Sequence, residues 1–339
     1  VNVITGNNGQ GKTSLLEAIY LLATTRSFRT ARLGELVRHG QSIASVRAKL
    51  GEGDRSRVSR LTREQSVGVK NGRRTVRIDG EAPATLTHYA TRSPVVVFDP
   101  QQMILSTGPA AERRTLLDRV TLFTHPEVAS HRARYGKALR ERQRLLTDRF
   151  PRLDAVPELD AYETLLAEHG AALTAARADA AEALGARMAE AFAAIAAPDL
   201  DLAVKYEPAG SADRDEASQR LRSGRHRDAQ SKRTSFGPHR DDLGLELGGH
   251  PARVVASQGQ HRAITLALKI AELRSIALAR GVEPILLLDD VSSELDPERT
   301  DALFRYLGGA RSQLFLTTTR ADLIVTPSHR ERRDFNVLE

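Results

Sequence analysis

The chain has 339 residues, enough for one large domain or two ordinary ones, and Lys and Arg outnumber Asp and Glu by 50 to 43. This modest basic excess permits a polyanionic partner without requiring one. Cysteine is absent, which excludes disulfides, thiolate nucleophiles and Cys-based zinc or iron–sulfur sites, and favours a reducing, cytoplasmic location. No long apolar run is present, so we expect no membrane-spanning segment.

A glycine-rich loop near the start of the chain predicts a nucleotide site. It fits the pattern G-x-x-x-x-G-K-[ST], and its expected ATP-binding residues are Gly6, Asn7, Asn8, Gly9, Gln10, Gly11, Lys12 and Thr13. Glycines permit the tight turn, and backbone N–H groups converge on phosphates. Lys12 is expected to reach the β- and γ-phosphates and to be essential for catalysis, and the Thr13 hydroxyl to bind Mg²⁺. An apolar strand before the loop and an amphipathic helix after it favour this interpretation over an ordinary glycine turn.

Residues 41–197 have strand patterns in their first part and helix patterns in their second. Residues 41–100 are typical of antiparallel strands, with a hairpin at 67–80 turning on Asn71-Gly72 in a type I′ turn. Residues 94–98 form an apolar run that predicts a buried strand. From residue 112 onward the pattern is that of long amphipathic helices, reaching residue 197.

The polar stretch at residues 208–234 has few large apolar side chains, so we expect a surface connection or a frayed helix there. Strand patterns then return at residues 243–249, 284–290 and 313–319, and residues 335–339 are a candidate edge strand. This order predicts one α/β sheet domain whose two halves are separated by a helical insertion.

The sequence ILLLDD at residues 285–290 has the Walker B pattern of an apolar strand ending in carboxylates. Asp289 is expected to bind Mg²⁺, and Asp290 to orient the attacking water. Apolar strands ending in Asp are common, and the assignment gains weight from the segment that follows. We expect that segment to be a D-loop formed by Ser293, Glu294, Leu295 and Asp296.

A second candidate phosphate-binding segment precedes an apolar helix. Its residues are Ser257, Gln258, Gly259 and Gln260. Alone, Ser257 would more often be an ordinary helix N-cap. The order of P-loop, Ser-x-Gly-Gln and Walker B is instead that of ABC-type ATPase heads, in which this serine contacts the γ-phosphate of ATP and is needed for catalysis. The predicted fold is therefore an α/β, ABC-ATPase-like P-loop head that is split by a helical arm.

Several segments together resemble the bacterial RecF recombination-mediator family. They are GNNGQGKTSLLEAIYLL with RSFRT at residues 26–30, Gly108-Pro109 with Arg113-Arg114 and Leu117-Asp118, GPHRDDL at residues 237–243, SQGQ at 257–260 and LLLDDVSSELD at 286–296. The resemblance covers residues 1 to about 339. It implies a head with a helical arm, and a chain that starts after the family's usual first residues.

The resemblance also implies a domain division and a function. The head would comprise residues 1–107 and 235–339, and the helical arm residues 108–234. The function would be ATP-driven homodimerisation and DNA binding with slow, DNA-dependent ATP hydrolysis in DNA repair, recombination, replication and the SOS response. Duplex DNA or single/double-strand junctions would be preferred, and the partners would be RecR, RecO and, indirectly, RecA.

Two positions are ambiguous within this resemblance. Thr319 stands at the switch position where transporter ATPases carry histidine, which disfavours a transporter subunit. The glutamine that contacts Mg²⁺ in many ABC heads would be Gln101 or Gln102. An SMC-like structural ATPase is the main alternative, although the arm is too short for a long coiled coil and lacks sustained heptads.

Basic side chains crowd one predicted helix. They are Arg132, Arg134, Lys137, Arg140, Arg142 and Arg144, opposed only by Glu141. A second group follows in the polar stretch, at residues 222–233. Either cluster is a solvated face or a set of sequence-independent phosphate contacts. Aromatic residues are 4% of the chain and Trp is absent, which favours duplex backbone binding over stacking on single strands.

Overall fold

The structure is a computed structural model that describes residues 1–52, 61–150, 156–195, 200–290, 297–307, 312–321, 324 and 331–337. By their contacts the residues form two compact units. Unit 1 comprises Val1–Gln102 and Ile276–Glu339, and unit 2 comprises Met103–Ser275. The two units are described separately below.

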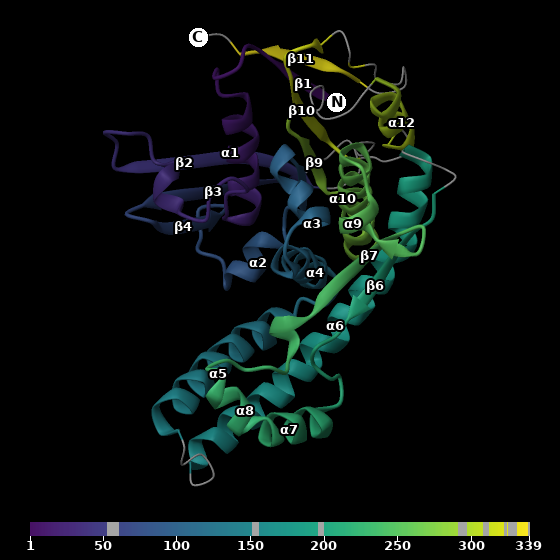
Figure 1. The fold of residues 1–339 in the computed structure, drawn as a ribbon. Helices are drawn as coiled ribbons and strands as arrows, with labels where there is room; N and C mark the ends of the chain where they lie inside the picture. Colours follow the sequence, from purple (N-terminus) through teal and green to yellow (C-terminus); the bar gives the residue numbers. More distant parts are fainter. Residues whose placement is uncertain are drawn as a thin grey trace. The chain divides into compact units, whose positions relative to one another are not determined.

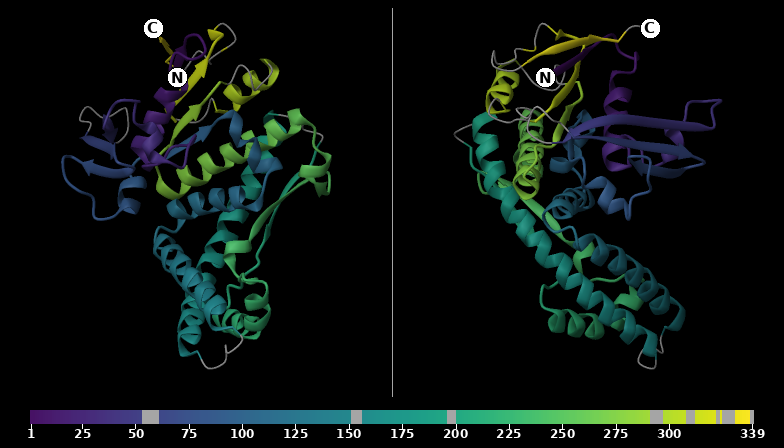
Figure 2. Two further views of the ribbon diagram at one scale, coloured as in Figure 1. Left: turned by 60° about the vertical axis from the view of Figure 1, so that its left-hand side comes forward. Right: turned by 180° about the vertical axis from the view of Figure 1, so that it is seen from behind.

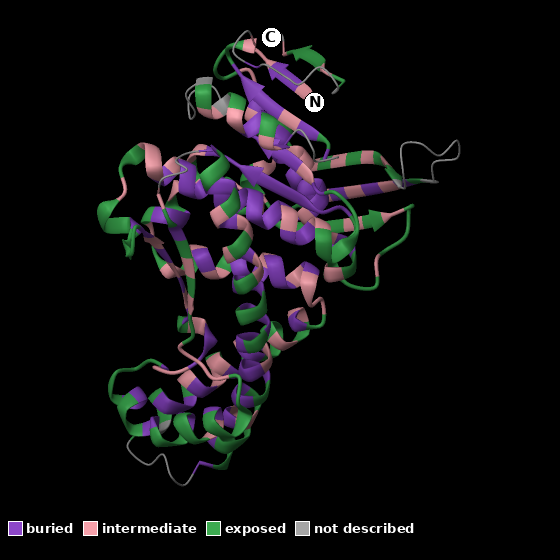
Figure 3. Cartoon of the chain, turned by 90° about the vertical axis from the view of Figure 1, so that its right-hand side faces the viewer, coloured by how far each residue is buried: buried purple, intermediate pink, exposed green. Residues whose placement is uncertain are grey.

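Unit 1 is built on a five-stranded parallel sheet in the order β11-β1-β10-β9-β5 (Figure 1). The strands are β1 (Asn2–Thr5), β5 (Val95–Phe98), β9 (Ile285–Leu288), β10 (Leu314–Thr318) and β11 (Arg333–Asn336). Strands β5 and β9 are continuous apolar runs, VVVF and ILLL, which is typical of parallel strands that are covered on both faces. Buried positions accordingly follow these strands (Figure 3). Parallel pairing brings the carboxyl ends of all five strands to one edge of the sheet, and ligands of such sheets bind at that edge.

Helix α1 (Lys12–Thr24) packs against two sheets of unit 1 at once. Leu16 and Tyr20 join Ile4 and Leu287 in the core beneath the parallel sheet. Leu21 and Leu22 face the other way, onto the core of the antiparallel sheet. Burial of each such side chain stabilises the fold by about 1.5–3 kcal/mol, so the helix that follows the glycine loop is firmly held.

The antiparallel sheet consists of β2 (Ile43–Glu52), β3 (Leu61–Lys70) and β4 (Arg73–Ile78). The expected hairpin is confirmed, because Lys70 pairs with Arg73 and both Asn71 (φ 50°) and Gly72 (φ 69°) have the positive φ of a type I′ turn. Shorter elements complete unit 1, namely η1 (Leu33–Leu36), α2 (Leu86–Ala90), η2 (Pro100–Met103), whose last residue belongs to unit 2, and α12 (Pro297–Leu307).

Unit 2 combines long helices with a small antiparallel sheet (Figure 2). Its helices are α3 (Ile104–Thr107), α4 (Ala110–Thr124), α5 (Val128–Arg149), α6 (Pro157–Ile195), α7 (Arg214–Ser223), α8 (Arg225–Gln230), η3 (Pro238–Arg240) and α9 (Ala252–Val255). Its strands are β6 (Leu202–Glu207), β7 (Asp242–Leu247) and β8 (His250–Pro251). Helix α10 (Gln258–Arg280) begins in unit 2 and ends in unit 1.

The compact units do not coincide with the boundaries expected at 107/108 and 234/235. Residues 235–275 group with the helices of unit 2 by their contacts. The reason is sheet pairing, since β7 takes β6 as its antiparallel neighbour along six residue pairs. The division into head and arm by function stays a prediction.

Residues 208–234 are more ordered than the expected connection. Asp213 caps α7 by accepting hydrogen bonds from the N–H groups of Asp215 and Glu216. Leu221 packs into the core between α5 and α6, and Arg225 is almost fully buried. Buried ion pairs, rather than a large apolar face, hold this segment in place.

None of the helices that the structure describes is long and apolar enough to cross a membrane.

Candidate nucleotide site

The glycine loop lies between β1 and α1, as predicted. Gly9 (φ 87°) and Gly11 (φ 92°) have left-handed backbones that favour glycine. A Cβ on Gly6 would lie 2.7 Å from Gln10 Oε1 and 2.9 Å from Val337 O, so no larger residue fits there. Lys12 Nζ donates to Gly6 O at 2.7 Å and to Asn7 O at 2.9 Å. The ammonium group is therefore folded over the loop, where a phosphate would sit.

Asp289, the first residue after β9, is held by two threonine hydroxyls. Thr13 Oγ1 donates to Asp289 Oδ1 at 3.0 Å, and Thr317 Oγ1 donates to the same oxygen at 2.6 Å. Asp289 is only 6% exposed, and its N–H donates to Phe98 O of β5 at 2.8 Å. Elements from both ends of the sequence thus fix one carboxylate beside the glycine loop.

Asp290 continues the turn with a left-handed backbone, φ 51°. Its N–H donates to Thr317 Oγ1 at 2.8 Å, so a single hydroxyl orients both neighbouring aspartates. Thr317 was missed by the sequence reasoning. A signal existed, because three consecutive threonines end a buried strand where apolar residues would be expected.

The remaining predicted positions around this edge fall in different settings. Thr319 is exposed just after β10. Gln101 is exposed, and its N–H donates to Asp99 Oδ1 at 2.9 Å. Gln102 has a buried Oε1 with no hydrogen-bond partner among the described residues. The predicted D-loop, Ser293 to Asp296, lies outside the described residues.

The donor set at this edge fits Mg²⁺. A threonine hydroxyl and a single carboxylate oxygen, Thr13 Oγ1 and Asp289 Oδ1, are 3.0 Å apart. Mg²⁺ takes hard oxygen ligands and is usually held by one or two carboxylates together with substrate phosphates. The described residues contain no cluster of three or more His, Cys, Asp or Glu that could hold a metal by itself.

Ser257 begins α10 in a reciprocal capping arrangement. Gln260 N–H donates to Ser257 Oγ at 3.3 Å, and Ser257 N–H donates to Gln260 Oε1 at 2.7 Å. Ser257 and Gln258 are exposed, whereas Gly259 and Gln260 are partly buried. The next residue, His261, is buried and hydrogen-bonded to Ser106 Oγ at 2.7 Å, and burial lowers its pKa. This segment belongs to unit 2, and the glycine loop to unit 1.

Two of the segments that carry the family resemblance meet inside unit 2. Arg113 forms a two-pronged ion pair with Asp242, both distances being 2.8 Å. Arg177 bridges Asp118 at 2.7 Å and Asp241 at 3.0 Å, and Asp241 is fully buried. These motif residues thus form a structural network of charge-assisted hydrogen bonds.

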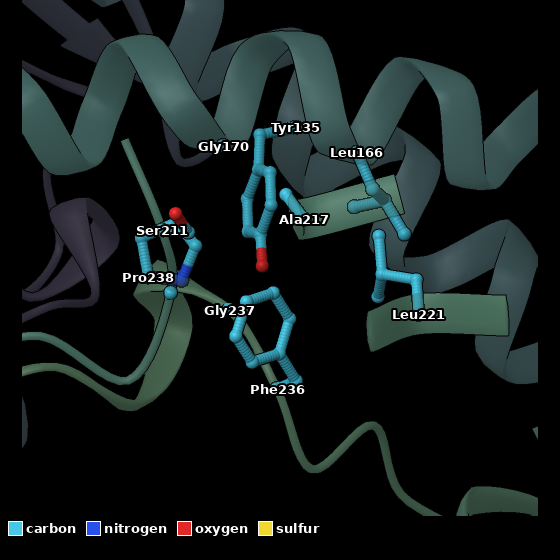
Figure 4. A pocket seen from close by; sticks show the side chains of 10 residues that line it. Tyr135, Leu166, Gly170, Ser211, Ala217, Leu221, Phe236, Gly237 and Pro238 are labelled. Atoms are coloured by element: carbon cyan, nitrogen blue, oxygen red, sulfur yellow. The ribbon is translucent and has the colours of Figure 1, made fainter. Parts of the chain in front are cut away.

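The same part of the chain contains a small, mainly apolar cavity. It is lined by Tyr135, Leu166, Leu221, Phe236 and neighbouring glycines. Figure 4 shows the hydroxyl end of the Tyr135 ring directed toward Gly237 and Phe236. That hydroxyl pairs with His239 Nδ1 at 2.7 Å, and His239 Nε2 with Thr234 O at 3.0 Å. The Tyr135 hydroxyl and both ring nitrogens of His239 are therefore hydrogen-bonded within the protein.

Half of the basic cluster on α5, namely Arg132, Arg142 and Arg144, is engaged in ion pairs. Arg142 is fully buried and contacts Glu163 at 3.1 Å and Asp228 at 2.8 Å, so it is structural. Arg132 pairs with Asp118 at 3.0 Å, and Arg144 with Glu141 at 3.0 Å. The exposed basic residues of the predicted DNA-binding set that form no ion pair within the described ranges are Arg134, Lys137 and Arg140.

Comparisons with known proteins agree with this geometry. The family model of the RecF/RecN/SMC N-terminal domain matches residues 1–330. The chain is 40% identical over 334 residues to the DNA replication and repair protein RecF of Anaeromyxobacter sp. (strain Fw109-5), covering 95% of this chain and 87% of that protein. It is 39% identical over 336 residues to the protein of the same name from Myxococcus xanthus (strain DK1622), covering 95% and 85%.

Solved structures extend the likeness to the fold. The recombination mediator protein RecF with ATPrS superposes with a TM-score of 0.85 at 29% identity, covering 96% of this chain and 88% of that one. The Smc head domain of Pyrococcus furiosus is similar in fold, with a TM-score of 0.53 at 18% identity, and it covers 95% and 84%. The α/β, ABC-ATPase-like fold is confirmed, and the chain belongs to the RecF family.

Proposed function

We propose that this protein is an ATP-dependent DNA-binding protein of DNA repair and replication, with weak ATPase activity that DNA stimulates. The observation that carries the proposal is the Asp289 carboxylate, which accepts hydroxyl donors from the glycine-loop helix and from β10. Relatives named for DNA replication and repair, and a solved RecF structure with ATP at 30% identity, support it.

ATP would bind in the loop from Gly6 to Thr13, whose backbone N–H groups would donate to the phosphates. Lys12 would exchange its two carbonyl partners for the β- and γ-phosphates. Thr13 and Asp289 would hold Mg²⁺, with the buried Oε1 of Gln102 as a further oxygen near this edge. Mg²⁺ supplies charge neutralisation of the phosphates when bound.

Hydrolysis would depend on Asp290. Its backbone is fixed by the Thr317 hydroxyl, so its carboxylate starts from a defined position at the end of β9. It would accept a hydrogen bond from the attacking water and orient it toward the γ-phosphate. Thr319, at the switch position, offers a hydroxyl rather than an imidazole, and this fits slow turnover.

Two subunits would be needed for catalysis. Ser257 lies exposed at the start of α10, where N–H groups at a helix N-terminus favour an anion. In the proposed dimer, the segment 257–260 of one subunit covers the ATP bound to the glycine loop of the other. Such a two-fold contact is self-complementary and requires the charge of ATP.

DNA is the proposed partner of the dimer, in keeping with a formal net charge of +7. The predicted contacts on α5 are Arg132, Arg134, Lys137, Arg140 and Arg144, of which the three without an ion pair are the strongest candidates. Duplex or junction DNA, RecO- and RecR-type mediators and assistance to RecA loading in gap repair and the SOS response complete the proposal. One solved relative is described as acting in the RecFOR pathway.

DNA binding by the Asp290→Asn protein tests this proposal. With ATP and Mg²⁺ the variant should bind duplex DNA at least as tightly as wild type while hydrolysing ATP at a small fraction of the wild-type rate. With ADP, both proteins should bind DNA weakly. Equal DNA affinity with ATP, with ADP and without nucleotide would contradict an ATP-dependent binding cycle.

A further inference from the structure

The antiparallel sheet of unit 1 has one face packed and one face exposed. On β3 the side chains of Arg63, Gln65, Val67 and Val69 are buried, and the two valines contact α1 residues Leu21 and Leu22. The alternate residues point the other way, as a pleated strand requires. Strands β2, β3 and β4 lie side by side (Figure 1). Their cross-strand register identifies the outward neighbours on β2 and β4.

Basic side chains dominate this outward surface, which we name the basic sheet face. Its charged members are Arg47, Lys49, Lys70, Arg73 and Arg77, with Glu64 on β3 and Asp79 just after β4 as acids. The ratio of basic to acidic groups on this face is five to two, which far exceeds the ratio of 50 to 43 in the whole chain. The Glu64 carboxylate is already paired with Arg47, at 3.5 Å.

Some of these charges are placed where they repel each other, although Arg77 Nη1 donates to Gly80 O at 2.6 Å. Lys70 and Arg73 stand directly opposite each other across the hairpin, a placement of like charges that destabilises a sheet. Arg47 and Arg77 flank Ser66 from the two neighbouring strands, about 10 Å apart at the usual strand spacing. A concentration of self-repelling cations is stabilised when an anionic surface covers it.

The middle of the basic sheet face is lined by small residues. Gly68 of β3 lies between Ser45 of β2 and Thr75 of β4, and Ser66 is the next outward residue along β3. Gly68 pairs in unbroken register on both sides, its backbone is not left-handed, and an added Cβ would meet nothing within 4 Å. Neither packing nor backbone conformation therefore requires glycine here. Glycine inside a regular strand often marks a place where a ligand approaches the backbone closely.

We propose that the basic sheet face binds the phosphate backbone of duplex DNA. This rests on the proposed DNA-binding function and adds a second contact surface to the α5 residues named above. A rim of cations around a floor of small hydroxyl residues and glycine suits a phosphate chain, since hydroxyls and backbone N–H groups are common phosphate donors. The named residues of this face include no aromatic side chain for stacking bases, which favours duplex over single-stranded DNA, and phosphate contacts carry no sequence information.

Two variants test the face in different ways. Gly68→Tyr leaves every charge in place and inserts a bulky side chain on the floor, in a residue type that strands favour. Lys70→Ala/Arg73→Ala removes two rim cations. The matched control, Lys205→Ala/Arg214→Ala, removes the same charge from exposed positions of unit 2. ATP affinity, measured in parallel, reports that the nucleotide site is intact in each protein.

Fluorescence anisotropy of a labelled duplex with ATP, over a range of salt concentrations, gives affinity and salt slope. We expect Gly68→Tyr to weaken binding at least about tenfold, and Lys70→Ala/Arg73→Ala to reduce the slope of log K against log salt by about 1.8. The control should keep the wild-type slope. Wild-type affinity and slope in both face variants would overturn this proposal while leaving DNA binding intact. Failure of the wild-type protein to bind DNA would overturn the proposed function as well, and would leave an acidic protein as the occupant of the face.

Discussion

Replacing Thr317 by valine should weaken nucleotide binding in a Mg²⁺-dependent manner. The two side chains have nearly the same shape, so the change removes a hydroxyl that donates to Asp289 at 2.6 Å and accepts from Asp290 N–H at 2.8 Å. Thr317 is only 1% exposed, and the orphaned N–H costs about 1–3 kcal/mol of stability. Loss of a group that orients a metal ligand typically lowers metal affinity about 10- to 100-fold, or about 1.4–2.8 kcal/mol.

Titration of a fluorescent ATP analogue, with excess Mg²⁺ and with EDTA, measures this effect. Thr317→Val should lose about 10- to 100-fold in affinity with Mg²⁺ and much less with EDTA, and Thr317→Ser should restore binding. Thr318→Val is the matched control, because Thr318 is equally buried and its Oγ1 accepts from Arg320 N at 2.9 Å. If Thr317→Val bound Mg²⁺-ATP within twofold of wild type, the assigned role of the hydroxyl would be wrong.

Three further outcomes are expected. Lys12→Ala should abolish ATP binding in an equilibrium titration, since no other cation of the glycine loop could face the β- and γ-phosphates. Arg142→Ala should lower the free energy of unfolding in urea by about 3–5 kcal/mol, because it leaves buried Glu163 and Asp228 short of a partner. Exposed Arg140→Ala should change that energy by less than about 0.5 kcal/mol, and equal effects would refute the structural role of Arg142. Burial lowers the pKa of His169, His239 and His261, so the unfolded chain binds more protons than the folded chain at acidic pH. The free energy of unfolding should therefore decrease as the pH is lowered through about 6.5. His239→Gln should make the urea midpoint less dependent on pH.

Local patterns predicted the elements of the candidate nucleotide site well. These elements are the glycine loop, the Asn71-Gly72 turn and two apolar strands, one ending at Phe98 and one just before Asp289. They depend on short-range rules of conformation and burial. Parallel strand ends share one edge of a sheet, so the approach of the glycine loop to Asp289 followed from the fold class. Thr317 was not foreseen, because its role depends on the register of β10 against β9.

Charged residues of unit 2 show where sequence reasoning failed. The sequence places Arg142 in a basic cluster that is either a solvated face or a set of phosphate contacts, because its charge is visible in the sequence and its depth is not. Helical spacing did carry a signal, since Arg142 shares a face with buried Ala138, Leu145 and Leu146. Its acidic partner Asp228 comes from 86 residues away, and only tertiary structure brings it there.

Similarly, the polar stretch from residue 208 to 234 was expected to be a connection or a frayed helix. The cap Asp213 and the spaced apolar pair Ala217 and Leu221 were readable as helix signals. The burial of Arg225 against Glu163 was not, because it needs a partner 62 residues away.

Sedimentation velocity of the Asp290→Asn protein, with and without ATP, tests the central claim most directly. With saturating ATP and Mg²⁺ at micromolar concentration, the protein should sediment as a dimer, and with ADP or no nucleotide as a monomer. Adding Ser257→Arg should leave ATP binding by the monomer intact and prevent the dimer, because the larger side chain occupies the place of the partner's phosphate. An Asp290→Asn protein that stays monomeric with saturating ATP and Mg²⁺ would contradict the proposed ATP-bridged dimer.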